Sequence, residues 1–361
     1  MADTKTGAKS ARYAPEVLVD YARDVFAAAG SEAREADIVA RHLIEANLYG
    51  HDSHGLVRVK KYVEWVKAGM VVPNRHVEVV SDRGAAVVLD GAFGYGQVIG
   101  KEAMELAAER VKAHGFTVLA TRNSGHLGRI GAWPEILAEA GFASFHFVNT
   151  SGFGILVAPH GGSDRRLSAN PIAAGSPVAG GPPLILDIAT SVVAEGKIQM
   201  SRNKHEKLAP GLVLDGHGKP TTDPEAFYAS PPGAIFPFGG HKGSGLSLFC
   251  EIFAGSLTGG FASNPKNPTA GRLVNNMLTI AFDPQAFAGA DFFRTDLDRL
   301  LAWTKASPPI EPSGAVLMPG DIERRTRAER EANGVPVDGE TLAQVLAAGA
   351  SVGVRAPKEL A

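Results

Sequence analysis

The sequence predicts an α/β fold whose core is accompanied by helical segments from both ends of the chain. Residues 14–70 read as helical, and the tail at about 321–352 returns to helix in two segments, Glu323–Asn333 and Gly339–Ala348. Between them, apolar runs of strand length at 85–89, 117–120 and 143–148 alternate with helical stretches at about 100–114 and 131–140. This alternation is typical of α/β proteins.

The N-terminal helices have recognisable start and stop signals. Ser31 is the expected N-cap of a helix that ends at Gly50, with apolar residues at helical spacing: Val39, Ala40, Leu43, Ile44 and Leu48. A second helix is expected over about Gly55 to Ala68. Asp52, Ser53 and His54 then lie at the junction, where Asp52 or Ser53 could cap the second helix.

The region from 150 to 260 is dense in Gly and Pro, with long connections between short strands. Long loops on a rigid scaffold are where binding residues tend to lie. A further helix is expected from about Gly243 to Leu257.

Composition excludes several classes of function. The chain has 361 residues, 45% of them hydrophobic and 20% charged, with a net charge of −2, so nothing indicates nucleic acid or an anionic membrane as a partner. The one cysteine, Cys250, lies in an apolar run and is expected to be a buried, inert thiol. No apolar run reaches the length of a membrane span, and Met1–Lys9 lacks a signal-peptide core, so we expect a cytoplasmic protein.

The stretch Asp52-Ser53-His54-Gly55, with Arg58 four residues after His54, is the most informative one for chemistry. A histidine titrates near neutral pH and can exchange protons, while an arginine fork binds a carboxylate with two hydrogen bonds. If the stretch is helical, both side chains lie on one face. The alternative interpretation is a capped helix start with a surface ion pair.

Other short segments combine glycine with polar residues. Asn123–Arg129 contains His126 between a predicted strand and a predicted helix, a common place for a site, although a turn with a surface histidine fits as well. Asn149–Gly152 and Ser168–Pro171 read as turns or weak binding signals.

Two segments could hold an anionic or sugar group. Leu184–Ser191 reads as a strand ending in Asp187, which could accept from a ribose hydroxyl, orient a histidine or form a structural ion pair. Phe238–Gly245 opens a helix with glycines and Lys242, which suits a phosphate. Neither P-loop nor G-x-G-x-x-G spacing occurs, so a nicotinamide dinucleotide would not be bound by a Rossmann fingerprint. His51 and His54 have no companion pair, and we expect no metal site.

Together these segments resemble the type 2 malate/L-lactate dehydrogenase family of NAD(P)-dependent oxidoreductases, over about Ala14 to Gly353. The resemblance rests on six motifs in order: Gly50–Gly55, Asn123–Arg129, Asn170-Pro171, Leu186–Ser191, His241–Gly245 and Pro319-Gly320. The first and fifth look most like the branch that acts on small 2-hydroxycarboxylates.

The resemblance implies a non-Rossmann malate/lactate (sulfolactate) dehydrogenase-like fold with two lobes, in a homodimer whose active site lies in a cleft between the lobes. Residues 10–75 and the C-terminal segment 311–361 would form one lobe. Residues 76–120 would begin the α/β core, and 121–310 would bind NAD or NADP. The implied cofactor contacts are Asp187, Ile188, Ala189, Thr190, His241, Lys242, Gly320 and Asp321.

The implied reaction is hydride transfer between NAD(P) and C2 of a small 2-hydroxy or 2-oxo acid. Members of the family use either the histidine matching His54 or the one matching His126 as proton carrier, so both stay open, with Ser53 and Arg58 completing the catalytic set. Two departures concern the pocket: His160 stands where many relatives carry a bulky aromatic residue, and Gly320-Asp321 replaces the more usual Gly-Glu. The alternatives are an NADPH-dependent cyclic imino acid or diketo acid reductase, and a non-catalytic metabolite-binding protein.

Overall fold

A computed structural model describes residues 11–269, 271–311 and 314–360. The polar segment Met1–Lys9 lies outside these residues. The chain divides into two compact units, which we call unit 1 (residues up to Arg75 together with Asp321 onward) and unit 2 (His76–Gly320).

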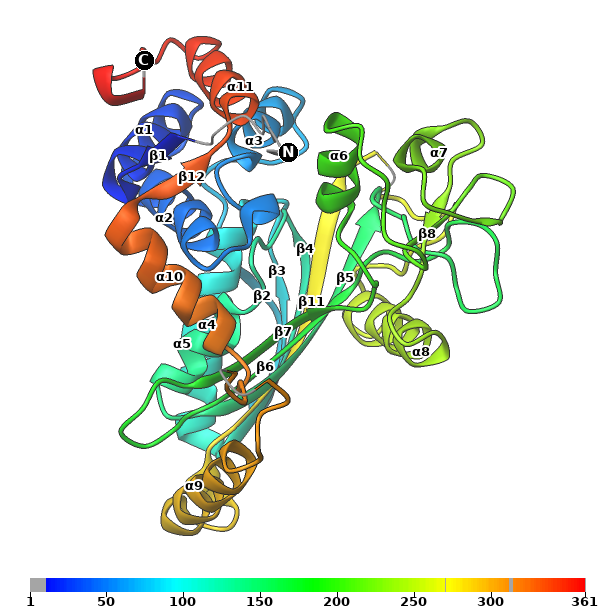
Figure 1. The fold of residues 1–361 in the computed structure, drawn as a ribbon. Helices are drawn as coiled ribbons and strands as arrows, with labels where there is room; N and C mark the ends of the chain where they lie inside the picture. The colour runs from blue at the N-terminus through cyan, green and yellow to red at the C-terminus, as the bar shows by residue number, and fades with distance from the viewer. Residues whose placement is uncertain (1–10, 270, 312–313, 361) are drawn as a thin grey trace. The chain divides into compact units, whose positions relative to one another are not determined.

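Unit 1 is built from helices of both chain ends. Its elements are α1 (Pro15–Ala28), α2 (Ala33–Leu48), α3 (Arg58–Lys67), α10 (Asp321–Asn333), α11 (Gly339–Ala350), the short helical turns at Asp52–His54 and Lys358–Leu360, and strands β1 (Ala11–Tyr13) and β12 (Val335–Val337). The two strands pair antiparallel, and α10 and α11 pack on α2 and α3 (Figure 1). The apolar stripes of α1 and α2 bury Val25, Phe26, Leu43 and Ile44 between them.

Unit 2 contains a seven-stranded sheet in the order β2-β3-β4-β11-β5-β6-β7. The strands are β2 (Glu78–Arg83), β3 (Ala86–Asp90), β4 (Phe116–Ser124), β5 (Ala143–Gly152), β6 (Pro171–Ser176), β7 (Leu184–Ala189) and β11 (Leu273–Phe282). Only β3 and β4 pair parallel, and α4 (Gly96–His114) connects them. The helices α4 and α5 (Ala132–Glu139) pack on strands of this sheet (Figure 1). The buried ring of Trp133 belongs to the apolar core of this unit.

The remaining elements of unit 2 are short. Strands β8 (Val213–Leu214), β9 (Pro220–Thr221) and β10 (Ala234–Ile235) form a small sheet beside α6 (Glu195–Asn203) and α7 (Pro224–Tyr228), around buried Ile198 and Phe227. Helix α8 (His241–Cys250) continues as a π-helical segment, Glu251–Ser256, which packs against β5. A turn at Pro284–Ala286 then leads to α9 (Ala290–Lys305).

The structure confirms the α/β class, the helical ends and the burial of Cys250, whose thiol pKa burial raises to about 12. The predictions for the starts of two helices are wrong. Ser31 does not cap α2: Glu32 occupies the N-cap, and the Ser31 hydroxyl is buried without a hydrogen-bond partner among the described residues. The second helix begins at Arg58 rather than Gly55, and neither Asp52 nor Ser53 caps it. The helix expected over about Gly243 to Leu257 is present, and it changes to π-helical form after Cys250.

The predicted turns at Asn149–Gly152 and Ser168–Pro171 are also different. Asn149 to Gly152 complete β5, and β6 begins at Pro171. The side chains of Asn149 and Asn170 are buried and both donate to the buried carboxylate of Glu251, at 3.0 and 2.8 Å. These asparagines therefore bond within the fold rather than in exposed turns.

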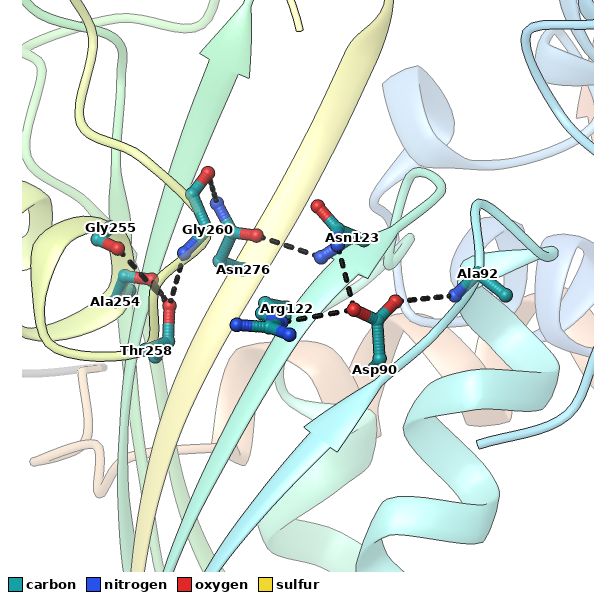
Figure 2. Close-up of polar contacts among 9 residues, drawn as sticks. All are labelled: Asp90, Ala92, Arg122, Asn123, Ala254, Gly255, Thr258, Gly260 and Asn276. Carbon is teal, nitrogen blue, oxygen red and sulfur yellow. Dashed lines mark hydrogen bonds and ion pairs between the residues drawn. The ribbon is translucent and has the colours of Figure 1, made fainter. Parts of the chain in front are cut away.

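The centre of the sheet is joined by a buried amide, Asn276 (Figure 2). Its Oδ1 accepts from the backbone N–H of Asn123 at 2.9 Å, and its Nδ2 donates to Asn149 Oδ1 at 2.9 Å and to the carbonyl of Gly260 at 3.0 Å. The pairing of β11 with β4 is irregular here, and Asn123 has a φ of 53°, so the side chain of Asn276 replaces a missing ladder bond.

We expect Asn276→Ala to destabilise unit 2 by about 3 kcal/mol, because two buried polar groups and one partly buried group lose their partner at about 1–3 kcal/mol each. Urea denaturation followed by circular dichroism measures this. The matched control is Asn333→Ala on α10, whose side chain bonds only to exposed Glu329, and which should change stability by less than about 0.5 kcal/mol. Equal stability of the two variants would contradict this role of Asn276.

Candidate functional site

The Asp52–His54 turn is held in place by one hydrogen bond of its own and by bonds from two helices of unit 1, α2 and α10. The His54 N–H donates to the His51 carbonyl at 2.8 Å, which closes the turn. Asn47 at the end of α2 donates to Asp52 Oδ1 at 2.7 Å, and Arg330 of α10 forms a two-pronged ion pair with the same carboxylate. Asp52 therefore anchors the turn rather than capping a helix.

Gly55 allows the chain to pass directly over Asn47. A Cβ at Gly55 would lie 2.2 Å from Asn47 Oδ1, and that same oxygen accepts from the Leu56 N–H at 2.7 Å. Asn47 is itself buried, so it has no room to retreat. The glycine is required by this close approach, since its φ of −95° is one that any residue adopts.

The environment keeps His54 neutral. Desolvation, followed by the positive charge of Arg58 and by the nearby His51 and His42, together lower the pKa of His54 to about 3. The guanidinium of Arg58 is oriented by a 2.6 Å bond from its Nε to the Ser53 carbonyl. Ser53, His54 and Arg58 are thus neighbours, although not on one helix face as the sequence suggested, because the helix starts only at Arg58.

The opening of α10 also belongs to unit 1. Arg324 donates to Asp321 Oδ1 at 2.6 Å, and Glu323 lies 3.9 Å from His51 Nε2. The predicted cofactor residue Asp321 is therefore in the same unit as His54. Its neighbour Gly320, with a φ of 91°, closes unit 2 in a left-handed conformation that favours glycine.

In unit 2, His126 lies on a loop between β4 and α5 that is bonded at several points. The Leu127 N–H donates to Asn275 Oδ1 at 2.9 Å, and the Gly131 N–H donates to Asp187 Oδ2 at 2.7 Å. The His126 side chain is 9% exposed, and the buried Arg129 pairs with Glu135. The loop is therefore rigidly positioned.

Asp187 makes a structural contact as well as being a predicted cofactor contact. By holding the Gly131 N–H, its carboxylate ties the end of β7 to the start of α5. This is the structural alternative that the sequence left open for Asp187, formed with a backbone N–H in place of an ion pair. Ile188 and Ala189 follow it on β7, paired with Ile172 and Pro171 of β6.

Thr190 and the start of α8 lie against each other. The Thr190 hydroxyl donates to the Asn170 carbonyl at 2.9 Å. The backbone carbonyl of Thr190 accepts from the Phe238 N–H at 3.0 Å. A Cβ at Gly243 would lie 2.3 Å from the Phe238 carbonyl and 2.8 Å from the Thr190 carbonyl. The motifs at 186–191 and 241–245 are therefore brought together by the fold.

A pocket of about 370 Å³ lies beside the start of α8. It is lined by Pro159, His160, Gly161, Gly162, Ser163, Leu214, Gly218, Pro220, Phe236, Pro237 and Gly240. His160 and His241 stand edge to face with ring centroids 5.9 Å apart, and the Ser244 hydroxyl accepts from the His160 N–H at 3.0 Å. His241 and Lys242 expose their side chains at the N-terminal end of the helix, where its dipole favours an anion.

Several positioning residues were not identified from the sequence. Asn47, Asn275 and Asn276 each hold a predicted site segment through a side-chain amide. No local sequence pattern indicates that an asparagine in a helix or strand is buried. The Asn275-Asn276 pair inside an apolar run is nevertheless unusual for a strand, and it could have indicated a structural role for these amides.

Comparison with known proteins identifies the family. The family model described as malate/L-lactate dehydrogenase matches residues 13–346. The chain is 39% identical to hydroxycarboxylate dehydrogenase B of Escherichia coli K12, over 95% of each chain, and 38% identical to an L-lactate dehydrogenase of Cupriavidus necator, over 85% of this chain and 88% of that one. The solved sulfolactate dehydrogenase of Methanocaldococcus jannaschii superposes with a TM-score of 0.85 at 33% identity, covering 96% of this chain and 98% of that one. The chain therefore belongs to the malate/L-lactate dehydrogenase family.

Two absences concern only the part of the chain that the structure describes. There, no helix is both long and apolar enough to cross a membrane. In the same residues, no group of three or more His, Cys, Asp or Glu side chains could hold a metal ion.

We expect Gly55→Ala to lower turnover at least about tenfold and stability by about 2 kcal/mol, because the new methyl group must displace Asn47 and with it the His54 turn. Steady-state kinetics and thermal melting measure the two effects. Gly339→Ala is the control in the same unit, since a Cβ there meets no atom within 4 Å. Turnover of Gly55→Ala equal to that of the control would contradict the role of this contact.

Proposed function

We propose that the protein catalyses reversible hydride transfer between NAD(P) and C2 of a small 2-hydroxy or 2-oxo acid, as a cytoplasmic homodimer. One observation carries this proposal: in a chain of this dehydrogenase family, His54 has a pKa of about 3 and adjoins Arg58, whose guanidinium is oriented by Ser53. A neutral imidazole accepts a proton, and a guanidinium binds a carboxylate in two-pronged fashion.

The residues of unit 2 suit a dinucleotide. The N-terminal end of α8, exposed Lys242 and the adjoining pocket offer positive potential and space, and Gly239 and Gly240 let the backbone come close to a ligand. We assign residues 121–310 as the dinucleotide-binding part, with Asp187 to Thr190, His241 and Lys242 as its contacts. Gly320 and Asp321, which follow this part in the sequence, are proposed as further contacts. When bound, the nicotinamide would carry the hydride.

The choice between NAD and NADP depends on a cation for the 2′-phosphate. Of the cations near α6, Arg202 already pairs with Glu225 at 3.0 Å and lies over the Tyr228 ring. Lys204 and Lys207 are exposed and are the better candidates.

The catalytic roles follow from charge. His54 would take the hydroxyl proton of the substrate during oxidation and return it during reduction, while Arg58 would bind the carboxylate. An anion bound to Arg58 screens the positive charge that lowers the pKa of His54, so the pKa should rise in the complex and ease proton return. Ser53 and His126 would hydrogen-bond the reacting oxygen or orient His54.

One specific relative supports a second candidate. A Pseudomonas syringae protein named Δ1-pyrroline-2-carboxylate/Δ1-piperideine-2-carboxylate reductase is 33% identical over 89% of this chain and 91% of that one. Reduction of a cyclic imino acid also needs a carboxylate anchor and a proton carrier, so the same residues would serve.

The testing experiment is to mix the protein with NADH or NADPH and a panel of 2-oxo acids and cyclic imines, and to follow absorbance of the reduced nicotinamide. We expect consumption with a 2-oxo acid. Consumption with imines only would assign the second candidate. Dinucleotide binding without any consumption would favour a non-catalytic binding protein.

We expect kcat/KM for hydroxy-acid oxidation to stay level well below pH 6, because His54 in the free enzyme remains neutral until the pH approaches its lowered pKa of about 3. A pH profile over the range in which the fold is intact measures this. An acid limb centred near pH 6.5, the value of an unperturbed histidine, would contradict the assignment.

His54→Ala is the companion variant, expected to lower kcat about 10²–10⁴-fold, the usual range for a lost general acid or base. His51→Ala is the matched control from the same motif, expected to change kcat by less than about tenfold. Loss of turnover in His126→Ala but not in His54→Ala would transfer the proton-carrier role to His126.

A further inference from the structure

Helix α9 of unit 2 is long, amphipathic and almost unpartnered (Figure 1). It spans 16 residues and none of its side chains is buried. One face, with Phe293, Leu297 and Leu301, is half-buried. Another face leaves Phe292, Leu300 and Trp303 exposed at 62%, 56% and 81%. An exposed tryptophan and phenylalanine on one helix indicate a surface that another molecule covers.

The exposed face has a definite pattern. Phe292, Asp296, Arg299 and Trp303 follow i, i+4, i+7 and i+11 spacing, which places them in one stripe along the helix. We call these four residues the α9 stripe. Asp296 and Arg299 are exposed, and neither forms an ion pair within the described residues. The stripe thus has an aromatic ring at each end and opposite, unpaired charges in the middle.

This order of residues is complementary to itself. If two α9 helices pack antiparallel about a two-fold axis between residues 297 and 298, Phe292 of each faces Trp303 of the other. The same axis places Asp296 opposite Arg299 of the other copy. One operation therefore makes two aromatic contacts and two ion pairs, which is the property of an isologous interface. Parallel packing of the same stripes would instead oppose like charges.

We propose that α9 pairs antiparallel with α9 of a second copy of this chain, through the α9 stripe. A bilayer surface is disfavoured because Asp296 stands in the middle of the stripe, and an unrelated protein would not require the two-fold order of its residues. Two copies of the stripe and Leu300 bury roughly 800 Å², below the ~1,200 Å² of a standard interface, so we expect a micromolar dissociation constant. The inference rests on the proposed homodimer but not on the proposed reaction.

The test uses single charge reversals in the full-length protein. Asp296→Arg and Arg299→Asp each oppose like charges across the axis, so each variant alone should associate at least about tenfold more weakly than wild type. An equal mixture of the two variants restores both ion pairs between unlike copies. We expect the mixture to associate within about threefold of wild type, as contact between Asp296 of one copy and Arg299 of the other requires.

Sedimentation velocity from 1 to about 100 μM measures the masses, and circular dichroism checks folding. Asp298→Arg is the control, because it reverses an acidic charge of the same helix outside the stripe and should leave association unchanged. Wild-type protein that stays monomeric would overturn the homodimer and this pairing together, whatever the enzyme assay shows.

One result would separate the pairing surface from the homodimer. Another exposed apolar surface follows α8 and the π-helical segment, with Leu248, Phe249 and Ile252 at 52%, 49% and 41% exposure. If both charge-reversal variants assemble like wild type while Phe249→Arg does not, the homodimer stands and the α9 pairing is overturned.

Discussion

The buried side chain of Asn276 is the interaction on which the arrangement of unit 2 depends. Asn276 lies on β11 and bonds to both neighbouring strands, to β4 at its irregular position and to β5. It also bonds to the turn at Gly260. Its neighbour Asn275 holds the loop that carries His126, and Asn149 continues the contacts to Glu251 in the π-helical segment. A buried amide with all of these partners stabilises one register only, since a shift by one residue would leave the same groups unpaired. The backbone pairing of β4 with β11 can therefore be interrupted near the loops of the predicted site while the sheet stays ordered.

The corresponding constraint in unit 1 is the contact between Asn47 and Gly55. It holds the short helical turn Asp52–His54 against α2, and Arg330 of α10 bonds to the same turn from the other end of the chain. The chemistry proposed for His54 follows from this packing, because the turn keeps its half-buried side chain close to Arg58 and partly removed from water. Desolvation and the positive charge of Arg58 both lower the pKa of His54, and so both favour the neutral imidazole. A carboxylate partner would have had the opposite effect on this histidine.

Much of the fold could be predicted from periodicity, and the exceptions have physical reasons. The apolar stripes of α2 and the strands at 86–90 and 143–148 are recognisable because their environments are simple. The central strand β11 was missed because Asn275-Asn276 divides its apolar run, and strands are normally depleted in asparagine. The start of α3 was misplaced because the residues before it bond to α2 and α10, which are contacts that local sequence does not encode. Likewise the burial of Ser31 is decided by tertiary packing rather than by its propensity to cap a helix.

The motif residues divide into two kinds once their partners are known. Asp52, Asn170 and Asp187 bond to other parts of the fold and hold segments together. His241 and Lys242 instead expose their side chains at a helix end beside a pocket. A shared motif therefore does not make each of its residues a ligand contact, because part of the motif builds the shape that presents the rest. For Asp187 both roles are compatible, because a carboxylate has about four acceptor sites on its two oxygens and the Gly131 N–H occupies one of them.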